Sequence, residues 1–374
     1  MRAFGATLGV VVLSTSLVVT AGPASAQDRP GPLLAHTGVS AAGVDGLDVV
    51  DTGTGRRWRV ADGLTHDASW SPDGSRIAWI AYGADDLGHV QVAAADGSGR
   101  TRVDGEGDSR SLAWSQEGTL AWFHRSAWAP TDCSAADRLR RPDLVLRGVD
   151  GATRTLGTVA PTADELELSP DGASAAWRER GDDVCGAAGT RLVVADVATG
   201  RQTVVPGAGG TTGLSFSPDS TTLLTHRATA DGGDVVLVDV PTRTARQVLT
   251  PGAGETHPVF VGDGTDLAVV RTTPDERTLS VVDRSGAPVR DLAEPPEFVE
   301  ALTASTDRVS VLVAGRSLPS ADGAVQDVQV WRQPLDGSAA TVLTGRGRAA
   351  TFEAAVASWP SDAPRLERRL RPRR

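Results

Sequence analysis

The chain is built around the stretch Ser69–Ile80, which reads SWSPDGSRIAWI. Its centre, Ser71-Pro72-Asp73-Gly74, has the residue order of a type I turn: a hydroxyl first, a proline with a preset φ second, and glycine last. After the turn, residues 77–81 are apolar at consecutive positions, so the strand that they form must be covered on both faces. A lone hairpin cannot provide that cover, and the strand therefore needs a neighbour on each side.

Further segments repeat this hairpin, and each can be aligned by the acidic residue of its turn. Starting from Asp73, the aligned acids are 44, 54, 48, 44 and 44 residues apart. Between successive copies lies a second hairpin, in which a β-branched run leads into a turn rich in Asp, Gly, Thr or Pro. A period of about 40–50 residues with four short strands per unit is typical of β-propeller blades. The repeated acids are Glu117, Asp171, Asp219, Asp263 and Asp307.

The two ends of the chain predict one further blade. Leu33–His36, Leu47–Asp51 and Arg56–Val60 match three strands of a blade, and Ala354–Trp359 matches the missing innermost strand. Because an open edge strand invites aggregation, we expect the ring to close through a blade that both ends share. The sequence thus predicts an all-β fold: a single closed β-propeller of four-stranded antiparallel blades, seven in number. A ring of six blades is the alternative, because the copy around Asp307 is the most divergent.

A secretory signal is expected before the propeller and a basic tail after it. Residues 1–26 contain Arg2, an apolar stretch and Ala-Ser-Ala before Gln27, and the apolar stretch is shorter than the roughly 20 residues that a membrane helix needs. Residues 27–362 are then the propeller, and residues 363–374 an Arg-rich disordered tail. We expect cleavage near Ala26 and a location outside the cell or at the cell envelope.

The repeated motif resembles that of the TolB-type propellers. The resemblance rests on Trp70–Gly74 with Ile77–Trp79 and on the copies in Leu168–Trp177 and Phe216–Leu224, and it extends over nearly all of residues 27–362. It implies the fold of the propeller part of TolB, a periplasmic component of a cell-envelope complex, and of the propellers attached to prolyl-oligopeptidase-like peptidases. We expect neither TolB's separate N-terminal α/β domain nor a hydrolase domain, so the resemblance implies a fold much more than a function.

Polar residues recur where the second strand of a blade ends, on the face of the ring that carries the long connections. In a ring, equivalent positions point toward a common region near the central channel. One interpretation is that a strand leaving the core simply ends in a polar residue. The other is a partly cationic rim that binds an anionic or sugar-like ligand, with His66 and His257 contributing from the connections between blades. The candidate rim residues are His36, His124, Arg178, His226 and Arg271.

Two cysteines, Cys133 and Cys185, fall in equivalent connections of consecutive blades. In an exported protein such a pair is usually a disulfide, and two free thiols are the alternative. Neither has a second Cys or a suitably spaced His beside it, so no metal site is expected. The connection Ser126–Pro142, which contains Cys133, is expected to be a long loop that either binds a partner or covers a blade edge.

No catalytic residue and no cofactor are expected from the motifs. The sequence has no Gly-x-Ser-x-Gly, no HExxH and no Gly-rich phosphate loop after a strand. The formal net charge of −10 makes nucleic acid a poor partner. We therefore predict a monomeric, non-catalytic module that binds an envelope protein, a glycan or a small anionic ligand. The alternative is a secreted hydrolase or lyase that acts on polysaccharide or peptide from the long-loop face.

Overall fold

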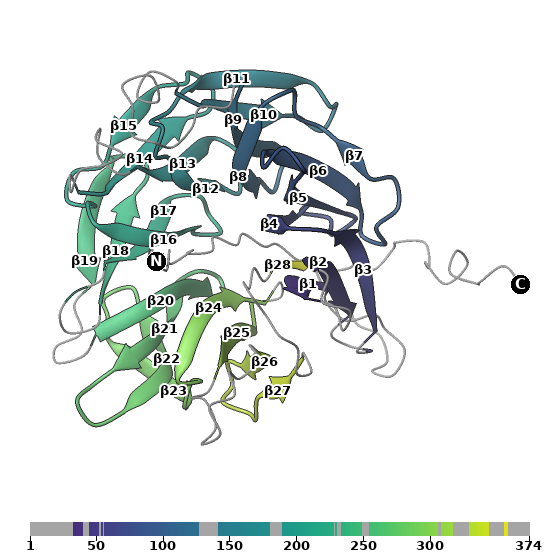
Figure 1. Ribbon diagram of the computed structural model, residues 1–374. Helices are drawn as coiled ribbons and strands as arrows, with labels where there is room; N and C mark the ends of the chain where they lie inside the picture. Colours follow the sequence, from purple (N-terminus) through teal and green to yellow (C-terminus); the bar gives the residue numbers. More distant parts are fainter. Residues whose placement is uncertain are drawn as a thin grey trace, which may run out of the picture.

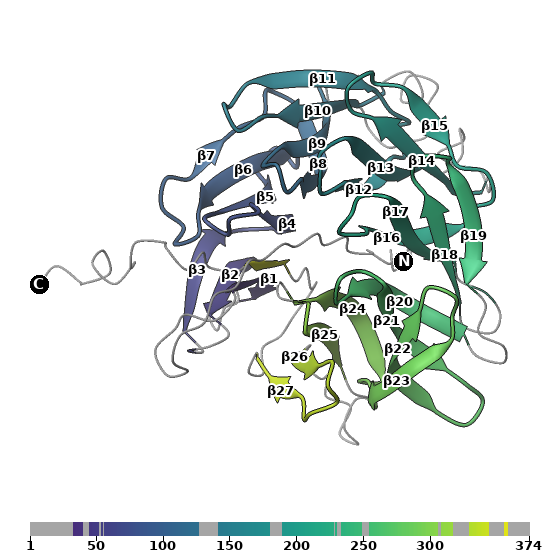
Figure 2. The same cartoon turned by 180° about the vertical axis from the view of Figure 1, so that it is seen from behind.

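The computed structural model describes residues 33–39, 45–51, 54, 56–126, 141–179, 189–227, 229, 233–248, 254–305, 308–316, 329–343 and 355–357. In this part of the chain every regular element is a β-strand. No helix among these residues has the length and hydropathy needed to cross a bilayer. The strands form seven antiparallel sheets of four, arranged as blades around a ring, which confirms the predicted fold and the blade number (Figures 1 and 2).

Each blade consists of four strands that run in order from the ring axis outward. Blade 1 contains β28 (Ala355–Ala357), β1 (Leu33–Val39), β2 (Asp45–Asp51) and β3 (Arg57–Asp62); blade 2, β4 (Thr65–Trp70), β5 (Arg76–Tyr82), β6 (Gly88–Ala94) and β7 (Thr101–Arg102); blade 3, β8 (Asp108–Trp114), β9 (Leu120–Arg125), β10 (Asp143–Arg147) and β11 (Thr153–Thr158); and blade 4, β12 (Asp164–Leu168), β13 (Ser174–Glu179), β14 (Arg191–Asp196) and β15 (Gln202–Val204). Blade 5 contains β16 (Thr211–Phe216), β17 (Thr222–Arg227), β18 (Asp234–Asp239) and β19 (Thr244–Val248); blade 6, β20 (Gly254–Val261), β21 (Asp266–Thr272), β22 (Arg277–Asp283) and β23 (Pro288–Ala293); and blade 7, β24 (Phe298–Ala304), β25 (Ser310–Arg316), β26 (Gln329–Pro334) and β27 (Thr341–Val342).

The turn that the sequence singled out has the predicted chemistry. Ser71 Oγ donates a hydrogen bond of 2.6 Å to Asp73 Oδ1, and the Gly74 amide donates to the Ser71 carbonyl at 2.8 Å. Gly74 has a φ of 66°, a conformation that glycine adopts without a steric penalty. Turns of neighbouring blades also bond to each other: the Gln116 amide, for example, donates to the Pro170 carbonyl at 3.0 Å.

The core lies between adjacent blades, because the second strand of each blade is apolar on both faces. Ile80 on β5 packs with Leu112 of blade 3 in one such layer. Trp177 on β13 lies edge-on to Phe123 of blade 3, with ring centroids 6.2 Å apart. A blade is therefore stable only between its neighbours.

The two ends of the chain are placed in the same blade. β28 lies beside β1, with Leu33 opposite Ala357 and Ala35 opposite Ala355. This is the arrangement that a shared blade requires, and closure of the ring through it stays a prediction. Cys133 and Cys185 lie outside the described residues, so the predicted disulfide also stays a prediction.

Candidate functional site

The innermost strands of five consecutive blades are irregular at the same level. Each has a register shift against its neighbour, and at the shift one residue adopts a positive φ. Such a β-bulge re-aims a side chain, and for residues other than Gly the conformation is strained. These bulge residues are Asp67 (51°), Ser111 (48°), Glu165 (52°), Gly213 (70°) and His257 (53°).

Two of the bulge carboxylates bond to the bulge of the following blade. Asp67 Oδ2 accepts a hydrogen bond from the Ser111 amide at 3.0 Å. In the same way Glu165 Oε2 accepts from the Gly213 amide at 2.8 Å. The bulge of blade 2 is thus linked to that of blade 3, and the bulge of blade 4 to that of blade 5.

The predicted rim residues occupy three successive register positions at this level. Arg178 and His226 are equivalent, because they pair with Asp164 and Thr212, the residues just before the bulges. His124 and Arg271 lie one position further along their strands. Because successive side chains of a strand point to opposite faces, the two pairs face different neighbouring blades.

His36 falls on a third register position. It lies on β1 opposite Asp48, one position before the equivalent of Arg178. Its side chain is outside the described part of the structure. The five predicted residues therefore do not form a single rim, although two of them lie together.

Arg178 is held by two carboxylates. Its Nε and Nη2 donate to the two oxygens of Asp164 at 2.8 and 2.7 Å. Its Nη1 lies 2.8 Å from Glu165 Oε1 and donates to Thr212 Oγ1 of the next blade at 2.9 Å. The side chain is 14% exposed, so this is a buried and neutralised cation rather than a free one.

Glu165 is a buried carboxyl group beside Arg178. Burial raises its pKa to about 7, and the Arg178 guanidinium and the Thr212 hydroxyl act in the opposite direction. Thr212 Oγ1 donates to Oε1 at 2.8 Å, and the Gly213 amide donates to Oε2. Both oxygens of the group are therefore engaged.

His226 faces His257 across the interface between blades 5 and 6. Their ring centroids are 5.8 Å apart. Burial lowers the pKa of His226 to about 4, and the charges of His257 and Arg178 add to this; burial also lowers the pKa of His257 to about 4. Both rings are neutral at pH 7, and the buried Nδ1 of His226 has no hydrogen-bond partner among the described residues.

We call the polar side chains at and just above the bulges of blades 2 to 6 the polar arc. It begins in blade 2, where His66 and Tyr82 meet edge to face with centroids 5.5 Å apart, and ends in blade 6. His66 and His257 were expected in connections between blades; that placement was wrong, since both lie within innermost strands. The polar arc comprises His66, Tyr82, Arg110, Asp164, Glu165, Arg178, Thr212, His226 and His257.

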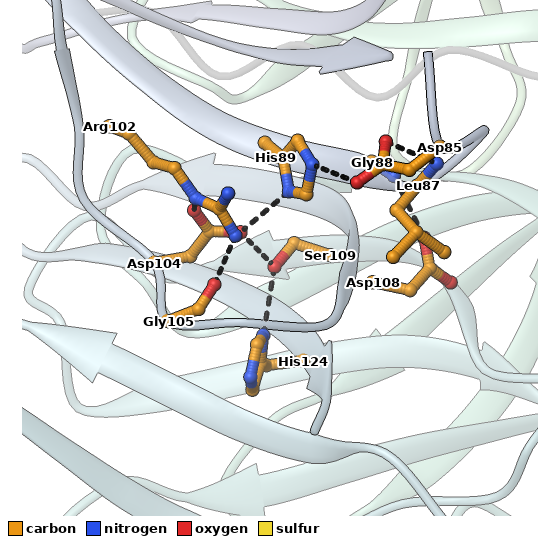
Figure 3. A network of polar contacts seen from close by, with 10 residues as sticks. All are labelled: Asp85, Leu87, Gly88, His89, Arg102, Asp104, Gly105, Asp108, Ser109 and His124. Atoms are coloured by element: carbon orange, nitrogen blue, oxygen red, sulfur yellow. Dashed lines mark hydrogen bonds and ion pairs between the residues drawn. The ribbon is translucent and has the colours of Figure 1, made fainter. Parts of the chain in front are cut away.

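His124 belongs to a separate polar cluster between blades 2 and 3 (Figure 3). Ser109 Oγ donates to Asp104 Oδ2 at 2.6 Å, and His124 Nδ1 lies 3.0 Å from the same Oγ. Since the single hydroxyl proton goes to the carboxylate, His124 Nδ1 is the donor in its contact with Ser109. His89 also faces Asp104, with Nδ1 3.9 Å from Oδ2.

This cluster combines Ser, His and Asp without being a catalytic triad. Ser109 is fully buried, so its hydroxyl cannot meet a substrate. Its proton also points to a carboxylate and not to an imidazole that would accept it. The cluster therefore holds two blades together. Within the described residues, no three His, Cys, Asp or Glu are grouped to hold a metal ion.

Most members of the polar arc carry no sequence signal of their own. Asp164, Glu165 and Thr212 belong to strands that look ordinary in the sequence. Only their distance from the turn motif marks them: each bulge residue lies six positions before the turn acid of its hairpin, as Glu165 does before Asp171. A sequence search six positions before the turn acids would have found Glu165, and one at seven positions would have found Asp164 and Thr212.

Comparison with known proteins shows the fold. No family model and no curated protein matches the chain. Among solved structures it is similar to TolB from Acinetobacter baumannii (14% identity, 87% of this chain, 82% of that one, TM-score 0.50). It is also similar to oligogalacturonate lyase from Vibrio parahaemolyticus (14%, 84% and 86%, 0.57). A third is the β-propeller domain of the Trilobed protease from Pyrococcus furiosus, which has an open velcro topology (11%, 86% and 95%, 0.59). The chain thus has the TolB-like propeller fold.

Acidification is expected to destabilise the protein through His226. Its pKa is about 4 when folded and about 6.5 when unfolded, so below pH 6.5 the unfolded chain binds the extra proton. The stability that the neutral ring provides is present above pH 6.5 and is lost as the pH falls toward 4. Between pH 7 and 4.5 the wild type should lose about 2 kcal/mol more than His226→Gln, measured by urea denaturation.

The wild type has to be compared with His226→Gln because Glu165 also titrates between pH 7 and 4.5. Its raised pKa acts in the opposite direction and stabilises the fold as the pH falls from 7 toward 4.5. His66→Gln, which removes an imidazole from the inner strand of blade 2, is the control. Equal acid losses in the wild type and in His226→Gln would contradict the assignment.

Proposed function

We propose that this chain is an exported binding module whose ligand site is the polar arc. The observation that supports binding is that every carboxylate oxygen of the arc already accepts a hydrogen bond from the protein. Both oxygens of Asp164 bond to Arg178, and both oxygens of Glu165 accept hydrogen bonds. These bonds hold both carboxylates toward Arg178, Thr212 and Gly213, whereas a general base must direct a lone pair at its substrate.

Apart from Arg110, the groups that the arc presents to a ligand are neutral or neutralised. His226 and His257 are uncharged at pH 7, and the positive charge of Arg178 is offset by two carboxylates. Together with the ring of Tyr82, these groups suit a ligand with many hydroxyl groups, such as a glycan, which needs hydrogen bonds and aromatic faces. The secretory signal expected in residues 1–26 supports a ligand outside the cytoplasm.

A second candidate function is favoured by one observation. Burial raises the pKa of Glu165 to about 7, which is the value that suits a general acid or base at neutral pH. The alternative is therefore a secreted hydrolase or lyase that acts on polysaccharide or peptide. In that case Glu165→Gln would abolish product formation from a ligand that it still binds.

A glycan array, with a pull-down from cell envelope and culture supernatant, tests the binding function. His226→Ala should weaken binding to every ligand found by about tenfold, because it removes a polar member of the arc. Arg271→Ala is the matched control: its side chain lies one position further along the strand and faces the other neighbouring blade. Binding that is equally strong in the wild type and in His226→Ala would refute the arc as the site.

A further inference from the structure

Arg110 is the second arginine of the arc. It lies on β8 directly before the bulge residue Ser111, opposite Phe123, at the level of Arg178 in the next blade. Its Nη2 donates to the carbonyl oxygen of Pro161. Among the described residues, no carboxylate lies within ion-pair distance of its guanidinium, although four of its five N–H groups remain beside the one that bonds to Pro161.

The surroundings of Arg110 disfavour its charge. Burial lowers the pKa of its guanidinium, and the neighbouring charge of Arg125 lowers it further. The acids that act in the other direction are Asp108 and Asp164. Asp164 is already engaged by Arg178, and Asp108 Oδ1 accepts the Gly88 amide at 3.0 Å. A shielded cation beside a second cation costs stability unless an anion joins it.

We propose that Arg110 anchors a carboxylate group of the ligand that the polar arc binds. This inference rests on the proposed function and specifies the ligand class as an acidic sugar or a similar carboxylate-bearing molecule. The planar fork of a guanidinium matches the two oxygens of a carboxylate. Arg110 is partly accessible to solvent.

The test compares D-glucuronate with D-glucose, which differ in the carboxylate. Isothermal titration of the full chain at pH 7 should show that glucuronate binds with a Kd of about 1–10 mM and that glucose binds at least tenfold more weakly. Arg110→Gln should weaken glucuronate binding about 10- to 100-fold, and Arg110→Lys about tenfold, because a lysine lacks the fork. Arg154→Gln, on the outermost strand of blade 3, removes the same charge and should have no effect.

Thermal unfolding of the ligand-free protein provides a second measurement. If Arg110 is kept for a ligand, Arg110→Met should leave the melting temperature unchanged or raise it by about 2 °C, because an uncompensated charge is removed. A purely structural Arg110 would instead make the variant less stable, and that result would overturn the proposal.

The outcomes separate this inference from the proposed function. Glucuronate binding that Arg110→Gln leaves unchanged, or no glucuronate binding by the wild type, overturns the role of Arg110. The binding function is judged independently by the glycan array and His226→Ala, and it stands if those ligands still need His226.

Discussion

Replacement of Arg178 by alanine is expected to lower the free energy of unfolding by about 3–5 kcal/mol. The guanidinium makes two hydrogen bonds to Asp164, contacts Glu165 and reaches Thr212 in the next blade. Alanine would leave the buried carboxylate of Glu165 and the partly exposed one of Asp164 without their counter-ion at the junction of blades 4 and 5. Urea denaturation at pH 7 measures the loss.

Two further variants show whether the cost comes from the stranded charges. Replacing the whole group, as Arg178→Met with Asp164→Asn and Glu165→Gln, should recover most of the stability, because no charge is left unpaired. Arg59→Ala breaks a similar two-bonded pair with Asp48 in blade 1, in which the side chains are 22% and 23% exposed. The carboxylates that Arg59 contacts, Asp48 and Asp62, are both more exposed than Glu165, so there we expect a loss of only about 1 kcal/mol. A comparable loss at Arg59 and Arg178 would contradict the argument.

Replacement of Trp177 by alanine is expected to cost about 3–5 kcal/mol. The indole is fully buried, meets Phe123 of blade 3 edge to face, and donates from Nε1 to Glu179 Oε1 at 2.9 Å. The variant would lose packing across a blade interface and would also remove a hydrogen bond from a buried carboxylate. The free energy of unfolding at pH 7 is again the measurement.

Trp177→Phe separates packing from hydrogen bonding. It keeps an aromatic ring against Phe123 and should cost about 1–3 kcal/mol, mainly through the donor lost to Glu179. Val149→Ala, at a side chain that is 72% exposed, should change stability by less than about 0.5 kcal/mol. If Trp177→Ala were as mild as Val149→Ala, the blades would not depend on their interfaces in the way described.

The fold could be predicted because the residues that form the turn of each repeat are recognisable in the sequence. Ser71, Asp73 and Gly74 fix a turn by contacts within a few residues, and the apolar strands that follow demand neighbours. The spacing of the copies then determines the number of blades. These features can be predicted from a single sequence because each depends on residues that are close together in the chain.

The site could be predicted only in part because it depends on register. Blade 3 has a turn one residue shorter than its neighbours: the Ser115 amide bonds to Thr119, whereas the Ser169 amide bonds to Ser174. His124 and His226 both lie seven residues after the turn acids of their hairpins. Because the turn of blade 3 is shorter, His124 nevertheless lies one register position further along and on the opposite face of its blade. Arg178 and His226 were placed correctly relative to each other because their turns have equal length.

The bulge residue of the innermost strand has a left-handed conformation in five blades, and this bears on how such chains diversify. Asp, Ser, Glu, Gly and His all occupy this position, so packing among the sectors, and not residue identity, imposes the local shape. The residue at this position can therefore be exchanged in one blade, which changes the chemistry presented there, while the strands and turns of the propeller stay the same. Among related sequences, variation should concentrate six residues upstream of an invariant hairpin signature.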